Sequence, residues 1–223
     1  MDIQPILKTE RLVLRPFVAD DATRVEELAG DKRIADVTAS IPHPYPKGVA
    51  IGWILSHPLK MKKGEAFNFA ITLTDTSKLI GCISIMNIRN KNGELGYWIG
   101  TEFWNNGYCT EACKCLVNYG FTKLNLNRVY AHHLSRNPAS GKVLAKSGLI
   151  HIGSSKSECG YQKKIEKTEL YEKFAAPSYS SKNEQLFRSW NEVAFPKPIS
   201  GNRFGKSVSR NERSPCQLLL KGA

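Results

Sequence analysis

The chain lacks the features that would mark it as a membrane, secreted or metal-binding protein. No apolar run approaches the roughly 18 residues that a membrane-spanning helix needs, and the start MDIQPILKTERL does not have the charged-then-apolar order of a secretory signal. None of the six cysteines belongs to a CxxC pair, which argues against a zinc site and against a disulfide framework. We therefore expect a cytoplasmic protein with reduced thiols, no metal site and no membrane partner.

Positive charge is what the chain has in excess. Its 32 Lys and Arg residues outnumber 20 Asp and Glu residues, which gives a formal net charge of +12 at pH 7. Such a balance indicates an anionic partner, for example a phosphorylated cofactor or a nucleic acid. A hydrophobic share of 41% excludes a wholly disordered chain. The length of 223 residues predicts one domain and an appendage.

The appendage is the last segment, residues 177–223. It carries eight Lys and Arg against three Glu, so eight minus three leaves a net charge of +5, and its aromatic residues follow no steady period. We expect residues 1–176 to form the domain and residues 177–223 to form a basic, mostly disordered tail. A short helix at 184–193 that docks its aromatics on the core is the alternative.

Residues 1–176 alternate helix and strand signals without internal repeats, which predicts a mixed α/β fold. Strands are expected at 11–17, 67–74, 79–88, 94–100, 128–134 and 168–174, and helices at 22–28, 110–122 and 139–146. A turn at 90–93 indicates a hairpin. Four prolines in 41–58 predict a loop with at most a short helix near 49–55.

One strand-to-helix junction could bind a phosphate. A strand is expected to end at Gly100 and a helix to open at Thr110, with Gly107 in the connection. Unpaired N–H groups and the positive end of the helix dipole suit a pyrophosphate, and a glycine lets the backbone approach it closely. An ordinary helix start is the alternative.

The strings LGYWIGTEFWNNGYCTEA and NPASGKVLAKSGL resemble the acetyl-CoA-binding core of the GNAT family of N-acetyltransferases. Within that family the chain is most similar to the branch of ribosomal-protein alanine N-acetyltransferases, for which the opening TERLVLRPF is also typical. The resemblance spans residues 9–174 and leaves the tail uncovered. It implies the GNAT fold, in which a mixed central sheet is splayed between its fourth and fifth strands and flanked by helices.

The resemblance implies acetyl-CoA as co-substrate and assigns the pyrophosphate to the connection. The residues whose backbone would bind it are Asn105, Asn106, Gly107, Tyr108, Cys109 and Thr110. Only the central glycine of the family pattern is kept, since the place of Asn106 usually holds a basic residue and that of Cys109 an alanine.

Three further positions match residues that contact the cofactor in the family. Trp98 and Ile99 match the strand that pairs with the pantetheine arm, and Asn137 matches an asparagine that commonly contacts the cofactor. A core aromatic is the alternative interpretation of Trp98.

The resemblance also suggests catalytic groups. The branch tends to have a serine at the place of Ser140, which would donate a hydrogen bond to the departing thiolate, whereas the tyrosine found in other members is replaced by Leu144. A helix N-cap is the alternative role of Ser140. Glu94 is the candidate base, with His132 or His133 on the facing strand as alternatives, only one of which can face the cleft. An exposed hairpin glutamate is the alternative for Glu94.

The acceptor is not readable from the loops that would select it, 41–58 and 155–167. We expect direct transfer to a primary amine, foremost the N-terminal amine of a protein or peptide, with a polyamine or amine antibiotic as the alternative. An acetyl-CoA-binding module without turnover and a ribosome- or RNA-associated protein are two further hypotheses. A homodimer is left open.

Overall fold

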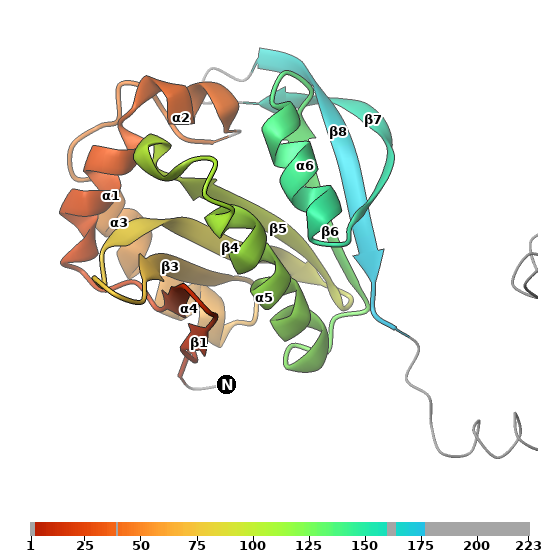
Figure 1. The fold of residues 1–223 in the computed structure, drawn as a ribbon, viewed down its shortest axis with the longest axis horizontal. Helices are drawn as coiled ribbons and strands as arrows, with labels where there is room; N and C mark the ends of the chain where they lie inside the picture. Colours follow the sequence, from red (N-terminus) through yellow and green to blue (C-terminus); the bar gives the residue numbers. More distant parts are fainter. Residues whose placement is uncertain (1–2, 39, 160–163, 177–223) are drawn as a thin grey trace, which may run out of the picture. The chain divides into compact units, whose positions relative to one another are not determined.

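The protein, described here by a computed structural model over residues 3–38, 40–159 and 164–176, is built on one eight-stranded mixed sheet (Figure 1). The strands follow the order β1-β2-β3-β4-β5-β6-β8-β7. β5 and β6 are parallel, and the other neighbours are antiparallel. The tail predicted at 177–223, with its alternative helix, lies outside the described residues and stays a prediction.

The strands are β1 (Leu7–Lys8), β2 (Leu12–Arg15), β3 (Phe67–Leu73), β4 (Leu79–Arg89), β5 (Asn92–Ile99), β6 (Arg128–Leu134), β7 (Ile150–Cys159) and β8 (Lys164–Phe174). The helices are α1 (Asp21–Ala29), α2 (Lys32–Val37), α3 (Val49–Leu55), α4 (His57–Lys62), α5 (Tyr108–Thr122) and α6 (Pro138–Lys146), with one 3-10 turn, η1 (Thr101–Phe103).

Side chains that alternate along the strands build a core on each face of the sheet. On one face Ile83 and Ile85 of β4 join a large cluster with Leu116 of α5, and Figure 1 shows α5 lying across the strands there. On the other face a smaller cluster joins Val25 of α1 to Ile54 of α3. The two faces of the sheet are therefore packed by different helices.

The sheet opens between β5 and β6. Asn92, Gly93 and Glu94 pair with β6, and the rest of β5 has no partner there within the described residues. Both strands continue beyond this point and diverge (Figure 1). β5 and β6 correspond to the fourth and fifth predicted strands, so the predicted splay is confirmed.

The structure contains three substantial elements that the sequence analysis did not predict. α2 is short and depends on Asp31, whose carboxylate accepts a hydrogen bond from the N–H of Arg33 (2.9 Å). α4 has Pro58 in its first turn, where a missing N–H costs nothing. β7 is mostly exposed and pairs along its length with β8, so ladder hydrogen bonds rather than an apolar pattern define it.

Candidate active site

The connection between β5 and α5 ends in a left-handed turn. The backbone angle φ is 63° at Asn105 and 78° at Gly107, and Gly107 is the N-cap of the 15-residue helix α5. The N–H groups of the first three helical residues have no carbonyl one turn earlier within the helix. These residues are Tyr108, Cys109 and Thr110. Free N–H groups and the positive end of a helix dipole favour an anion at such a helix start.

Side chains of the connection hold its backbone in place. The Asn106 amide donates to the carbonyls of Phe103 (3.2 Å) and Trp104 (3.0 Å). The indole Nε1 of Trp104 donates to the carbonyl of Ile99 (2.7 Å). The Asn106 side chain is therefore engaged within the turn, and being neutral it brings no positive charge to a phosphate.

Arg11, directly before β2, lies against the same turn. Its Nη1 donates to the carbonyl of Asn106 (3.0 Å), its Nε donates to Glu111 (2.8 Å), and its guanidinium carbon lies 4.8 Å from the centre of the Tyr108 ring. A Cβ added at Gly107 would come within 3.5 Å of its Nη2. The sequence analysis missed this residue because it lies far away in the chain, although the TERL string that contains it was noted.

The edge of β5 that faces β6 is open beyond Glu94. The N–H of Gly100 donates to the carbonyl of Ile80 on β4 (2.9 Å), and backbone groups of successive residues point to opposite edges. The backbone N–H groups of Tyr97 and Ile99 therefore point to the open edge, whereas that of Trp98 points to β4. The side chain of Trp98 packs against the smaller core. An extended ligand can pair with the N–H groups of Tyr97 and Ile99 as an added strand would.

Tyr97 and Ser140 meet on the face of the sheet that α6 covers. The phenol oxygen lies 2.9 Å from Ser140 Oγ and 3.1 Å from the Ser140 carbonyl, to which it donates. Burial raises the pKa of Tyr97 far above its ordinary value, so the phenol keeps its proton. The sequence analysis did not single out Tyr97, and Leu144, at the family's tyrosine position, is buried in the core.

Asn137 is the N-cap of α6. Its Oδ1 accepts a hydrogen bond from the N–H of Ser140 (3.3 Å), and its Nδ2 donates to the carbonyl of Val37 at the end of α2 (3.3 Å). The alternative role of Ser140 as the N-cap is therefore wrong. Ser140 is the third residue of the helix, and its hydroxyl is in contact with that of Tyr97.

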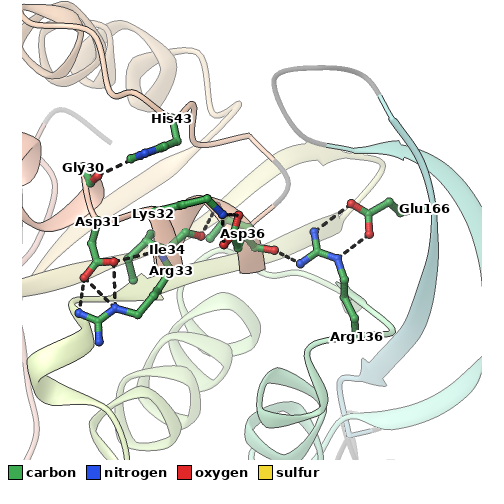
Figure 2. A network of polar contacts seen from close by, with 10 residues as sticks. Gly30, Asp31, Lys32, Arg33, Ile34, Asp36, His43, Arg136 and Glu166 are labelled. Carbon is green, nitrogen blue, oxygen red and sulfur yellow. Dashed lines mark hydrogen bonds and ion pairs between the residues drawn. The ribbon is translucent and has the colours of Figure 1, made fainter.

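A second contact joins α2 to the segment before α6. Arg136 donates to the carbonyl of Asp36 and forms two hydrogen bonds with Glu166 of β8 (2.7 and 2.9 Å), as Figure 2 shows. α2 is thus tied to the loop that follows β6, which fixes the position of α6 relative to the N-terminal part of the domain.

Glu94 and His132 meet where β5 and β6 part. Glu94 Oε1 lies 3.0 Å from His132 Nδ1, and its Oε2 accepts a hydrogen bond from Asn87 (2.7 Å). The hydrogen bond with His132 lowers the pKa of Glu94, and the same bond raises the pKa of His132. Because side chains alternate along β5, this pair lies on the face opposite to Tyr97.

His133 faces the other way, as alternation requires. It is buried, its Nδ1 donates to the carbonyl of Leu134 (2.9 Å), and its Nε2 has no partner among the described residues. His132 is one-third exposed, so it is the histidine of the two that an acceptor in the cleft can reach.

Within the described residues, no three His, Cys, Asp or Glu side chains gather in a way that could hold a metal ion. The described helices include none that is long and apolar enough to cross a bilayer.

Residues 11–150 match the family described as the acetyltransferase (GNAT) domain. The chain belongs to the GNAT family. An uncharacterised N-acetyltransferase of Bacillus licheniformis is 32% identical over 151 residues, which cover 65% of this chain and 84% of that protein. The ribosomal-protein-serine acetyltransferase of Escherichia coli is 31% identical over 97 residues, which cover 43% of this chain and 53% of that protein.

The fold also occurs in a solved complex with the co-substrate. The microcin C7 self-immunity acetyltransferase, in complex with acetyl-CoA and AMP, superposes with a TM-score of 0.67 at 18% identity, over 75% of this chain and 94% of that chain. GNAT proteins are N-acetyltransferases that use acetyl-CoA, so the predicted family, enzyme class and donor are confirmed. The left-handed turn at Gly107 and the open edge of β5 fit this ligand.

Proposed function

We propose that this GNAT protein acetylates the N-terminal amine of a protein or peptide by direct attack on acetyl-CoA. The observation that carries the proposal is the placement of two polar pairs on opposite faces of the splay, Glu94–His132 and Tyr97–Ser140. A thioester lying between β5 and β6 would have Glu94 and His132 on the side of the attacking amine. Tyr97 and Ser140 would lie on the side of the sulfur.

The co-substrate would be held mainly by backbone groups. Its pyrophosphate would lie on the N–H groups of residues 105–110, beside the Arg11 guanidinium, whose charge is shared with Glu111. The pantetheine arm would pair with the open edge of β5. The N–H groups of Tyr97 and Ile99 at that edge would also polarise the thioester carbonyl.

His132 would accept the proton of the amine, with Glu94 orienting it. In this scheme Nδ1 of His132 donates to Glu94, so Nε2 would carry the lone pair that takes the proton. The lowered pKa of Glu94 makes its carboxylate a weaker base, whereas the raised pKa of His132 makes its imidazole a stronger one. Glu94, the first candidate for the base, becomes a positioning residue in this scheme.

Tyr97 and Ser140 would stabilise the leaving thiolate. The buried phenol stays protonated, and it shares a hydrogen bond with the Ser140 hydroxyl. One of these two hydroxyl groups can turn toward the sulfur while the other supports it. In this proposal the hydrogen-bond donor to the thiolate is the pair and not Ser140 alone.

The chemistry of the base favours an α-amine over a polyamine. An N-terminal amine has a pKa of about 7.7–8.0, whereas an alkyl amine such as that of lysine has a pKa of about 10.4. A histidine base removes the first proton at a much smaller cost. The relative from Escherichia coli is named as a ribosomal-protein acetyltransferase, which supports a protein acceptor.

The test is a comparison of acceptors by release of CoA. Peptides that begin with Ala or Ser should be used with higher kcat/KM than spermidine or an aminoglycoside. A peptide with a blocked N-terminus and one internal lysine is the control and should not be acetylated. Faster turnover of the small amines would contradict the proposal and favour the small-amine alternative.

A further inference from the structure

A cavity of about 490 Å³ lies beside Glu94, at the closed end of the splay, and is open to solvent. The residues that line it are Asn87, Arg89, Asn90, Asn92, Arg128 and Tyr130. Two are cations, three are amides, and none is a carboxylate. The sequence analysis assigned no function to any of them, because they come from three strands and the turn between two of them.

The cavity adjoins the proposed base. Asn87 lines the cavity and donates to Glu94 Oε2 (2.7 Å), and Tyr130 lines it and is the register partner of Glu94 on β6. Tyr130 and His132 project from the same face of β6, since side chains alternate along a strand. A group in the cavity would therefore lie on the side of the sheet from which the amine attacks.

Arg128 is held in place but keeps free donors. Its Nε donates to Glu172 (2.7 Å), and its guanidinium carbon lies 5.1 Å from the centre of the Tyr130 ring. A guanidinium has five N–H donors, so the contact with Glu172 leaves the Nη groups available. Arg128 thus presents a fixed, directed donor pair of the kind that binds carboxylate or phosphate.

Arg89 has no ion-pair partner in the described part of the chain. It is exposed at the end of β4, where its register partner across the hairpin is Asn92 of β5. Among the described residues no carboxylate pairs with its guanidinium, whereas Glu172 partly neutralises that of Arg128. Arg89 therefore brings to the cavity a positive charge that no ion pair within the described residues compensates, and this charge attracts an anion.

We propose that this cavity binds an anionic side chain close to the N-terminus of the acceptor. The inference rests on the proposed function, and it narrows the substrate class to peptides with a carboxylate or phosphate within the first three residues. Asn92, the partner of Arg89, lies two residues from Glu94 along β5, which is about 7 Å. An extended peptide covers that span in about two residues, so the side chain at the second or third position reaches the arginines.

The test uses three peptides that differ only at positions two and three, which hold Glu, phosphoserine or Gln. Charge-assisted hydrogen bonds of this kind correspond to about ten- to a hundredfold in kcat/KM in favour of an anionic peptide. Arg89→Gln should reduce this preference to about threefold or less and leave the rate on the Gln peptide unchanged. The ratio of the Glu to the phosphoserine peptide tells which anion fits better.

Lys91→Gln is the matched control, because it removes the same charge from the same hairpin at a residue that does not line the cavity. It should keep the preference for anionic peptides. Equal use of the anionic and Gln peptides by the unmodified enzyme would overturn the inference and leave N-terminal acetylation standing. Equal losses in both variants would indicate a general charge effect and would overturn it as well.

A separate outcome would count against the proposed function itself. If none of the peptides is acetylated, calorimetric titration of the Glu peptide in the presence of CoA still decides the cavity. Binding that Arg89→Gln abolishes and Lys91→Gln retains would support the anion site, and absence of binding would overturn it.

Discussion

Glu94, the last residue of β5 that pairs with β6, faces His132 where the two strands part, with the carboxylate oxygen 3.0 Å from the imidazole nitrogen. The hydrogen bond to Glu94 raises the pKa of His132 above its ordinary value. Below that pKa the imidazole is charged and cannot accept a proton. We therefore predict that kcat/KM for an N-terminal peptide rises with pH through the raised pKa, in a profile measured from about pH 5 to 9.

Glu94→Gln should move the acid limb of this profile, in which kcat/KM rises with pH, to lower pH. Without the carboxylate, burial acts alone on His132 and lowers its pKa. His132→Gln should instead remove the limb and reduce turnover by about 10² to 10⁴. The matched control is His151→Gln, because His151 forms a similar pair with Glu169 (2.9 Å) on the β7–β8 ribbon. An unmoved limb in Glu94→Gln, with normal activity in His132→Gln, would exclude the pair from catalysis.

The sequence predicted the local parts of the site better than the distant ones. The order of strand, glycine turn and helix around Gly107 is a continuous stretch, so its residues carry the signal together. Glu94 and His132 entered the sequence analysis as rivals for one role. Their pairing depends on the parallel register of β5 and β6. The sequence does not reveal this register, because α5 lies between the two strands along the chain.

Contacts between distant segments account for what was missed. Arg11 reaches the turn only because β2 and α5 pack in the same domain, and Tyr97 looks like any strand residue until α6 brings Ser140 to it. β7 has exposed side chains over most of its length. Neither packing partners nor ladder hydrogen bonds can be read from a periodic pattern of apolar residues.

A second prediction concerns the turn that would hold the pyrophosphate. Gly107→Val places a β-branched side chain at a φ of 78°, which costs about 1–2 kcal/mol, and adds atoms where the phosphate should approach. We expect loss of measurable acetyl-CoA binding by calorimetry. Gly64→Val is the control, since Gly64 has a φ of 69° with open space around it and lies in another loop. It should lose similar stability and keep its affinity. Full affinity in Gly107→Val would contradict the assignment.

A third prediction concerns stability at acid pH. Two hydrogen bonds of 2.7 Å join Arg15 to Asp21, and Asp21 also accepts from the N–H of Val18 (2.9 Å). Burial raises the pKa of Asp21, but these hydrogen bonds outweigh it, so the pKa in the folded protein lies below that in the unfolded chain. The resulting stability is present above the unfolded value of about 3.9 and is lost as pH falls through the folded pKa.

Asp21→Asn should therefore lower the free energy of unfolding by about 1–3 kcal/mol at neutral pH and flatten its acid dependence. Urea unfolding at several pH values measures both effects. Asp20→Asn changes the exposed neighbouring carboxylate and should alter neither. An unchanged acid dependence in Asp21→Asn would show that other carboxylates govern acid unfolding.

The last prediction concerns the thiolate. Because Tyr97 and Ser140 share a hydrogen bond, Tyr97→Phe and Ser140→Ala should each leave acetyl-CoA affinity nearly unchanged and lower the rate of acetyl transfer in a single turnover. Loss of the hydroxyl in contact with the sulfur should lower this rate by a factor of about 10² to 10⁴, and loss of the other hydroxyl should lower it less.

The double variant separates a shared role from two independent ones. If the two hydroxyl groups act as a unit, its loss should be close to that of the worse single variant and not the product of both. Ser147→Ala is the control at the C-cap of α6, where the hydroxyl donates to the carbonyl of Val143 (2.8 Å) and has no contact with Tyr97 among the described residues. Normal transfer in both single variants would remove this pair from the mechanism, because a thiolate that needs no donor there leaves unaided.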